Sequence, residues 1–286
     1  MVEFEVPEID YDRYTNRQLA AVPLAVLGVA LVVILAWFVM YGTPVALGFD
    51  FTGGTEIRIA TTGDSISEVR DTFDVADDAV TPIQGGNEFL VQTQDSDADA
   101  LESTARDAGY AVTQVQERSA SFGADSQQTA LLGILVAFGG MSLLVFGLFR
   151  TFVPSIAVVI SAFSDIMIPV ALMNILGIPL SLGTVAALLM LIGYSVDSDI
   201  LLNNHILRRR GDFYESTYAA MQTGVTMTLT SIAAMVVMTI TARLFQIPLL
   251  PDIGLILVFG LTVDLMNTYM LNLSLLRWYK FEGVAR

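Results

Sequence analysis

The sequence predicts an α+β membrane protein, with a bundle of six transmembrane helices and one small ferredoxin-like domain of βαββαβ order. Hydrophobic residues make up 54% of the 286 residues and the mean hydropathy is +0.63, which exceeds the balance of an ordinary soluble domain. These residues gather in long apolar segments, each near the roughly 20 residues that a helix needs to cross a bilayer. A polar region, residues 42–128, interrupts them with short alternating patterns.

The chain begins with a polar segment, residues 1–18, and its first apolar segment follows at residues 19–41. The polar start has no short apolar core with a small-residue cleavage site, so no cleavable signal peptide is expected. Only Arg150 and Thr151 separate the second and third spans, which predicts a tight hairpin, and residues 279–286 form a tail. The five later spans are expected at residues 129–149, 152–176, 179–203, 218–242 and 252–278.

The polar region reads as alternating strands and helices. Ile57 and Ile59 alternate with polar residues, which is the period of a half-buried strand. Ser65 or Asp64 is suited to cap the first helix, and Gly85 with Gly86 favours a hairpin turn. Strands are expected at residues 56–60, 79–84, 88–93 and 112–118, and helices at residues 65–73 and 97–108. This order is that of a ferredoxin-like domain.

Positive charges beside the spans predict that both chain termini lie in the cytoplasm. With the N-terminus inside, Arg243 alone of the flanking cations lies in a short outer loop. Residues 42–128 are left out of this count because large translocated domains do not follow the rule, and they are then extracytoplasmic. The cytoplasmic cations are Arg13, Arg17, Arg150, Arg208, Arg209, Arg210, Arg277, Lys280 and Arg286.

The formal net charge of −15 is concentrated in the polar region. Between Asp50 and Gln128 there are 16 acidic residues against four arginines, a net of 12 negative charges, and Lys280 is the single lysine of the chain. An acidic, lysine-poor exposed domain suits concentrated salt, which screens the repulsion between carboxylates. We therefore expect a halophilic source, with an acidic partner-binding surface as the alternative.

Four aspartates interrupt the later spans: Asp165, Asp197, Asp199 and Asp264. A charged carboxylate at the centre of a span costs about 2.5–3.5 kcal/mol, and such residues usually mark ion or substrate pathways. No lysine or arginine is expected at the same depth to pair with them. We interpret them as candidates for coupling to a proton or sodium gradient; the alternative is a structural hydrogen-bond network without transport.

Other polar residues of the spans are placed around these acids. Asp197 and Asp199 lie about 200° apart on a helical wheel, so their helix is expected to present polar groups to neighbours on two sides. Thr223, Thr226 and Thr230 share one face of the fifth span. Their hydroxyls are expected either to donate hydrogen bonds to the acids or to take part in ordinary helix packing.

Two further features are interpreted as structural. Gly133, Gly140 and Gly147 repeat every seven residues in the second span, which predicts a seam for close helix packing. His205, the single histidine, lies at the cytoplasmic margin beside the arginine cluster and is interpreted as an interfacial residue.

The sequence contains no pattern typical of an enzyme. It has no cysteine, no arrangement of a nucleophile with a base, no phosphate-binding loop and no metal-ligand motif. We therefore predict a non-enzymatic protein of the lipid bilayer that uses no cofactor or metal and binds no nucleic acid.

Three stretches of the chain resemble a known family. LGFDFTGG at residues 47–54, directly after the first span, resembles the signature of the SecD/SecF protein-export membrane proteins. IGYSV at residues 192–196 and MNTYMLNLSLLRWYK at residues 266–280 resemble the fourth and last spans of the SecF branch. The resemblance covers essentially the whole chain, and its most specific part is LGFDFTGG.

The resemblance implies a half-transporter related to the resistance–nodulation–division superfamily. It implies that the chain works with a SecD-type partner, the protein-conducting Sec channel and the translocating preprotein, driven in bacteria by the proton gradient. The fourth-span acid of bacterial members, in the pattern GYSVND, falls on Ser198 here, and Asp197 stands in place of the asparagine. This departure points to an archaeal type of the family.

The signature motif itself is interpreted as structural. Its glycines permit positive φ or close backbone approach, and Asp50 can cap nearby amides where the chain leaves the membrane. The motif residues are Gly48, Asp50, Phe51, Thr52, Gly53 and Gly54. We expect them to shape the junction between the first span and the polar domain.

Two other functions are weighed against export. A proton-coupled small-molecule efflux half-transporter of the same superfamily is disfavoured, because such pumps usually have larger external domains and twelve spans in one chain. A purely structural scaffold for the translocase is the other alternative.

Overall fold

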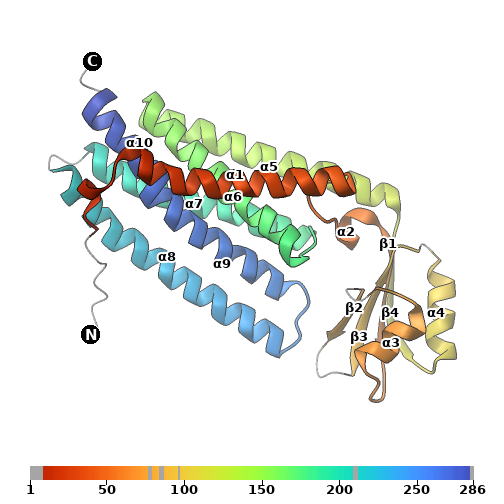
Figure 1. The fold of residues 1–286 in the computed structure, drawn as a ribbon. Helices are drawn as coiled ribbons and strands as arrows, with labels where there is room; N and C mark the ends of the chain where they lie inside the picture. Colours follow the sequence, from red (N-terminus) through yellow and green to blue (C-terminus); the bar gives the residue numbers. More distant parts are fainter. Residues whose placement is uncertain (1–8, 77–78, 84–86, 96, 209–211, 284–286) are drawn as a thin grey trace.

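The computed structural model describes residues 9–76, 79–83, 87–95, 97–208 and 212–283. A bundle of long helices forms most of the molecule, and a small domain of strands and helices lies at one end of it (Figure 1). The two ends of the described chain meet at the opposite end of the bundle, where Arg277 Nη1 donates a hydrogen bond to the Tyr11 carbonyl at 2.9 Å. This is the arrangement that an even number of spans requires.

Six helical segments are long and apolar enough to cross a membrane, as the sequence predicts. The last span is a continuous helix in which two π-helical turns, η2 and η3, alternate with α-helix. The spans are α1 (Asn16–Tyr41), α5 (Ala120–Phe149), α6 (Phe152–Leu176), α7 (Leu182–Arg208), α8 (Phe213–Leu244) and the run α9 (Leu250–Met266), η2 (Asn267–Asn272), α10 (Leu273–Trp278) and η3 (Tyr279–Gly283). The chain is therefore a multi-pass membrane protein.

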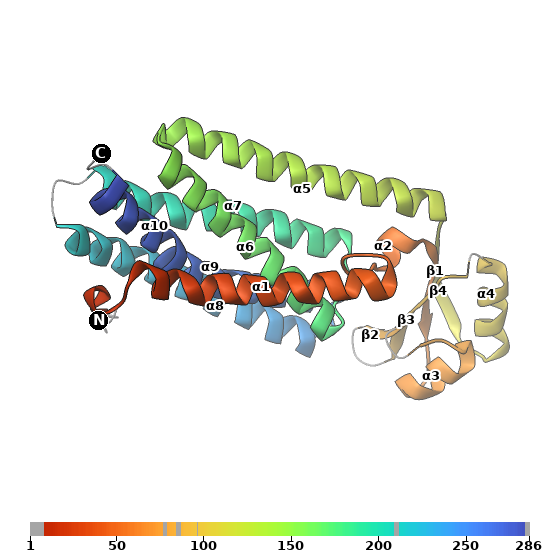
Figure 2. The same cartoon turned by 45° about the horizontal axis from the view of Figure 1, so that its top comes forward.

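Three spans form the centre of the bundle. In the most apolar part of α6, 61% of the residues are buried, and in α7 and the last span 56% are buried, against 6% for α5 and 11% for α8. Figure 2 shows α5 along one side of the bundle and α8 along the opposite side. Polar side chains on the inner faces of α6, α7 and α9 are thus held away from lipid.

The small domain is an antiparallel four-stranded sheet of order β2-β3-β1-β4. Its elements follow the predicted βαββαβ sequence, while the predicted turn at Gly85 and Gly86 lies outside the described residues. The elements are β1 (Gly54–Ala60), α3 (Ile66–Phe73), β2 (Val80–Ile83), β3 (Glu88–Thr93), α4 (Ala98–Asp107) and β4 (Ala111–Arg118). The ferredoxin-like prediction is confirmed.

Local sequence explains the domain's elements. Ser65 caps α3 through a capping box with Glu68, and the Asp97 side chain caps α4. The alternating Ile57 and Ile59 of β1 are fully buried and form the domain core with residues of β3, α3 and α4. Burying these side chains stabilises the domain by about 1.5–3 kcal/mol for each large aliphatic group.

The structure departs from the sequence prediction in α5. This helix begins at Ala120, because Ser119 caps it and a polar first turn precedes the apolar part.

The predicted glycine seam of α5 is not made within the described chain. Gly140 and Gly147 are exposed, and no atom lies within 4 Å of a Cβ placed on Gly133, Gly140 or Gly147. Seven-residue spacing set the glycines on one face, but that face points out of the bundle.

Candidate functional site

Three of the four predicted aspartates meet in the centre of the bundle. Asp165 of α6, Asp199 of α7 and Asp264 of α9 are each at most 1% exposed, and serine, threonine and asparagine side chains lie between them. We call this group the acid cluster. Its members are Asp165, Ser195, Ser198, Asp199, Asp264, Asn267, Thr268 and Asn272.

Asp165 accepts one hydrogen bond on each carboxylate oxygen. The Ser195 hydroxyl of α7 donates to Oδ2 at 2.5 Å, and Asn267 Nδ2 of η2 donates to Oδ1 at 2.6 Å. The two donors come from different helices, so this carboxylate ties α6 to both other central spans.

Ser198 lies between the other two acids. Its hydroxyl is within hydrogen-bonding distance of both Asp264 oxygens, at 2.8 and 3.0 Å, and of Thr268 Oγ1 at 3.2 Å. It also lies 2.9 Å from the Ser195 carbonyl oxygen one turn earlier. A single hydroxyl rotor therefore has four acceptors within reach, and its proton can be directed toward any of them.

Asp199 completes a chain of hydrogen-bonding groups. Thr268 Oγ1 donates to Asp199 Oδ1 at 2.9 Å and also lies 3.4 Å from Asp264 Oδ1, and Asn272 Nδ2 donates to Asp199 Oδ1 at 2.8 Å. Asp199 Oδ2 has no hydrogen-bond partner among the described residues. This oxygen lies in the buried centre near the Ser161 hydroxyl of α6, which also has no hydrogen-bond partner among the described residues.

The π-helical turn η2 places the donors of the last span. Asn267 and Asn272 lie five residues apart, the spacing of a π-helical hydrogen bond, and both are fully buried and donate to aspartates. Single π-helical turns within α-helices are often found at functional sites. The sequence reasoning missed Ser195, Asn267, Thr268 and Asn272; the cluster of polar residues in NTYMLN was the signal available.

No basic side chain neutralises these acids. Among the described residues, no lysine, arginine or histidine forms an ion pair with Asp165, Asp199 or Asp264. The same part of the chain contains no group of three or more acidic, histidine or cysteine side chains arranged to hold a metal ion. Hydroxyl and amide donors supply the stabilisation that the acids receive.

Asp197 does not belong to the cluster. It is exposed on the outer side of α7, whereas Asp199 is fully buried. The two acids lie on different faces, as the wheel angle predicts, but the expectation that both faces present polar groups to neighbouring helices was wrong for Asp197 in the described chain. The predicted hydroxyl bonds from Thr226 and Thr230 to the acids are not made either. Both side chains are exposed and donate within α8, to the carbonyls of Gln222 at 2.7 Å and of Thr226 at 2.6 Å.

His205 lies away from the cluster, at the end of α7. It is half-buried, and its Nδ1 is 2.9 Å from the Leu201 carbonyl oxygen of its own helix. Arg209 and Arg210 of the predicted arginine cluster lie outside the described residues.

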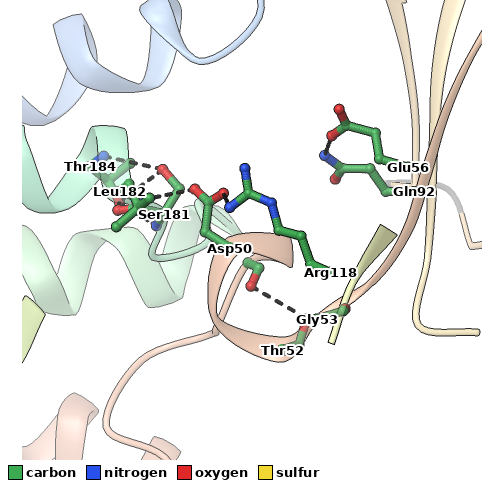
Figure 3. A network of polar contacts seen from close by, with 10 residues as sticks. Asp50, Thr52, Gly53, Glu56, Gln92, Arg118, Ser181, Leu182 and Thr184 are labelled. Carbon is green, nitrogen blue, oxygen red and sulfur yellow. Dashed lines mark hydrogen bonds and ion pairs between the residues drawn. The ribbon is translucent and has the colours of Figure 1, made fainter. Parts of the chain in front are cut away.

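The signature motif forms the junction between bundle and sheet domain. Phe49–Thr52 is a short helical turn, α2, and Asp50 at its start accepts hydrogen bonds from two distant groups (Figure 3). Arg118 Nη1 at the end of β4 lies 2.6 Å from Asp50 Oδ1, and the Leu182 backbone N–H at the start of α7 donates to Oδ2 at 2.9 Å. The prediction that Asp50 caps local amides was wrong in one respect, because the amide belongs to the fourth span.

The glycines of the motif are needed for their backbone. Gly53 and Gly54 have φ of 74° and 124°, where a side chain is disfavoured. A Cβ on Gly54 would also collide with the Thr93 carbonyl oxygen of β3. Thr52 Oγ1 lies 3.4 Å from the Gly48 carbonyl oxygen, and Phe51 is 1% exposed under α5, where Gln127 Nε2 donates to its carbonyl at 2.7 Å.

Comparison with known proteins supports the family resemblance. The family model described as "Protein export membrane protein SecD/SecF, C-terminal" matches residues 98–282. The chain is also 66% identical to protein-export membrane protein SecF of Haloferax volcanii and 60% identical to that of Haloquadratum walsbyi, over the full length of each pair. The chain belongs to the SecD/SecF family.

Relatives of the SecD/SecF family from other archaea are more distant. The SecF protein of Pyrococcus furiosus is 37% identical, with 93% of each chain covered. The two most similar relatives named above are from halophilic archaea, in agreement with the acidic composition.

Solved structures show the same fold. The crystal structure of SecDF, a translocon-associated membrane protein from Thermus thermophilus, matches 96% of this chain with a TM-score of 0.73 at 21% identity. SecDF in its super-membrane-facing form matches all of the chain with a TM-score of 0.58. The chain spans 39% and 40% of the length of these two SecDF chains.

Proposed function

We propose that the chain is a non-enzymatic accessory subunit of the protein-export machinery. In this role it works with a SecD-type partner and the protein-conducting channel to promote movement and release of preproteins. Membership of the SecD/SecF family and full-length similarity to proteins named protein-export membrane protein SecF support this role.

The orientation is part of the proposal. Both chain termini face the cytoplasm, and the sheet domain lies outside the membrane, where an emerging preprotein would meet it. The excess of flanking arginines and lysine on one side of the spans supports this orientation. The small domain would then contact exported chains from the far side of the channel.

The acid cluster serves as the ion-coupling centre in this proposal. Three buried carboxylates without a cation cannot all carry charge, because desolvation and mutual repulsion are too costly. The cluster therefore has to hold protons or a small cation, and in this proposal it also releases them during each transport cycle. The hydrogen-bond chain from Asp264 through Ser198 and Thr268 to Asp199 carries this argument, because a proton can pass along hydroxyls that both donate and accept.

The junction at Asp50 links ion binding to the sheet domain. The helix α7 carries Ser198 and Asp199 in its middle and is held at its first residue, Leu182, by the Asp50 carboxylate. The same carboxylate binds Arg118, the last residue of the sheet. A shift of α7 on protonation of the cluster would therefore move the base of the domain.

The direct test is Asp199→Asn and Asp264→Asn in cells that lack the native subunit. Secretion of a preprotein is followed by pulse-chase, and co-purification of the SecD-type partner is measured on the same variants. We expect export to fall to the level of cells without the subunit while the partner is retained. The matched control is Asp125→Asn, an exposed acid in α5 outside the cluster, which should export normally.

The outcomes separate the alternatives. Full export by both cluster variants would leave a structural scaffold as the better function. If a protonophore abolishes the stimulation of preprotein export and a sodium ionophore does not, protons are the coupled ion. Export of small molecules by the complex, with unchanged preprotein secretion, would favour an efflux half-transporter.

A further inference from the structure

A cavity lies at the end of the bundle opposite the sheet domain, beside the turn that joins α5 to α6. Its volume is about 380 Å³, and its wall comes from the ends of α5, α7 and the last span and from the cap of α6. Figure 2 shows the α5–α6 turn and the end of the last span together at this end of the bundle. The cavity is separate from the acid cluster, since no described member of that cluster lines it.

One side of the cavity carries a positive charge. Lys280 of η3 lines it together with Tyr279, and no acidic side chain is among the described residues of the wall. The ammonium nitrogen of Lys280 lies 3.4 Å from the Ile206 carbonyl oxygen and 5.7 Å from the centre of the Phe213 ring. The carbonyl takes one of the three N–H donors of the ammonium group. Donors therefore remain for a group in the cavity.

Two polar atoms of the wall are buried without a partner. Thr151 Oγ1 and Asn204 Oδ1 form no hydrogen bond with any described residue. Thr151 is the N-cap of α6, yet its side chain caps no amide of that helix. Buried polar atoms in native proteins nearly always bond to protein, water or a ligand. The wall thus offers a hydroxyl that donates or accepts and an amide oxygen that accepts.

The rest of the wall is apolar and continues onto the outside of the bundle. Leu148 and Phe149 of α5 and Leu207 of α7 line the cavity. Leu148 is 39% exposed, and Leu144, one turn earlier on the same face of α5, is 60% exposed. A molecule with a polar head and a hydrocarbon tail therefore meets matching surfaces in the cavity and along α5.

The cavity lies at the level where the spans leave the hydrocarbon. Trp278 and Tyr279 lie near the end of the last span, and Arg150 is exposed in the turn beside the cavity. Tryptophan, tyrosine and basic residues gather at the interface between membrane and water. In the proposed orientation this is the cytoplasmic interface, where basic pockets between spans bind the headgroups of anionic lipids.

We propose that this cavity binds the glycerophosphate headgroup of an anionic lipid. Lys280 and the Thr151 hydroxyl donate to phosphate oxygens, where the N-terminus of α6 also favours an anion. Asn204 Oδ1 accepts from a glycerol hydroxyl, and one hydrocarbon chain of the lipid runs along Leu148 and Leu144. A soluble glycerophosphate shares the polar part of this chemistry but leaves the apolar part of the wall uncovered. The inference does not depend on the role in export.

Retention of lipid by the purified full chain tests the site. In a salt concentration that keeps it folded, the chain is exchanged into detergent with equimolar phosphatidylglycerol and phosphatidylcholine and passed through gel filtration. Mass spectrometry then counts the bound lipids. We expect a single phosphatidylglycerol to be retained and about fivefold less phosphatidylcholine. Excess glycerol 3-phosphate should leave the lipid in place, because it lacks a hydrocarbon chain.

Three side chains test the assignment of the wall. Lys280→Gln should lower the retained phosphatidylglycerol by about fivefold, the effect of one cation near an anionic surface, and Lys280→Arg should restore it. Thr151→Val keeps the shape of the side chain and should lower retention by about two- to tenfold, the range for one hydrogen bond. Arg243→Gln removes an exposed cation from the opposite end of the bundle and is the matched control, with unchanged retention.

Contrary outcomes overturn the inference in recognisable ways. Equal retention of both lipids would exclude recognition of the headgroup, and displacement by glycerol 3-phosphate would assign the cavity to a soluble anion. Unchanged retention in Lys280→Gln and Thr151→Val would place the lipid elsewhere, and an equal loss in Arg243→Gln would show attraction by overall charge.

Thermal denaturation of each variant separates loss of lipid from loss of folding. Lys280 also contacts the end of α7 and the start of α8, so Lys280→Gln can lower the melting temperature. Thr151 Oγ1 has no partner among the described residues, so Thr151→Val should melt at an unchanged temperature and carries the test by itself if Lys280→Gln unfolds.

Discussion

Replacing Asp165 by asparagine should separate the chemistry of the acid cluster from its contribution to folding. Asp165 is 1% exposed, and each of its oxygens accepts one hydrogen bond, from Ser195 and from Asn267. Asparagine has nearly the same shape but cannot gain or lose a proton in the physiological range. If the carboxylate carries protons, Asp165→Asn should abolish stimulation of export.

The structure sets the expected change in stability. In Asp165→Asn, the new amide oxygen still accepts a hydrogen bond from Ser195. The Oδ1 atom of Asn267 has no partner in the native structure, and it can accept from the new NH₂ group once the Asn267 amide flips. Both bonds survive, so the free energy of unfolding should change by less than about 1 kcal/mol. In Asp165→Leu both buried donors lose their acceptor at about 1–3 kcal/mol each, a destabilisation of about 2–6 kcal/mol.

The assay combines preprotein secretion in cells with thermal denaturation of the purified chain in nanodiscs. We expect Asp165→Asn to be folded and inactive, and Asp165→Leu to be inactive with a lowered melting temperature. An asparagine variant with full export would refute a role for the carboxyl proton. An asparagine variant as unstable as the leucine variant would refute the hydrogen-bond exchange with Asn267.

Three further predictions concern other parts of the molecule. In Gly224→Ala the new methyl group would collide with the buried Tyr269 hydroxyl, so the free energy of unfolding should fall by about 1–3 kcal/mol in thermal denaturation. Gly140→Ala is the control, because no atom lies within 4 Å of a Cβ placed there, and its free energy of unfolding should change little. Asp50→Asn should weaken the charge-assisted bonds of the junction by about 1–3 kcal/mol and increase hydrogen exchange at the start of α7; unchanged exchange would contradict the proposed link. Hydrogen bonds from the backbone and hydroxyl of its capping residue, Ser65, lower the pKa of Glu68. The Glu68 carboxylate therefore stabilises α3 above the pKa it has in the unfolded chain, and this stabilisation is lost as the pH falls through the lowered pKa of the folded state. NMR titration of the Glu68 side chain will check the direction of the shift.

Much of the fold follows from patterns that are local in sequence. Each span exceeds the length needed to cross hydrocarbon, and the alternation of Ile57 and Ile59 and the cap at Ser65 act within a few residues. Their consequences in the structure, six spans and a βαββαβ domain, do not depend on distant contacts. The bounds of α5 and α8 were harder to predict, because their first turns are polar and lie beyond the apolar part.

The site was predicted in part. Their position within apolar spans identified Asp165, Asp197, Asp199 and Asp264 as costly residues, and the structure brings all but Asp197 into one buried group. The threonines of α8 were equally suggestive in sequence, yet Thr226 and Thr230 lie on the exposed face of a peripheral helix. Helical periodicity places residues on a common face but does not say which neighbour that face meets.

By itself, the sequence determined that this is a six-span membrane protein of the SecD/SecF type with acids inside its spans, since hydrophobic length, charge placement and the LGFDFTGG motif are properties of the chain alone. Only the tertiary structure decided that Asp199 is buried while Asp197 faces outward, and that a π-helical turn aims Asn267 and Asn272 at the acids. The reason is that the exposure of a helix face depends on how neighbouring helices pack. That packing is a property of the assembled bundle.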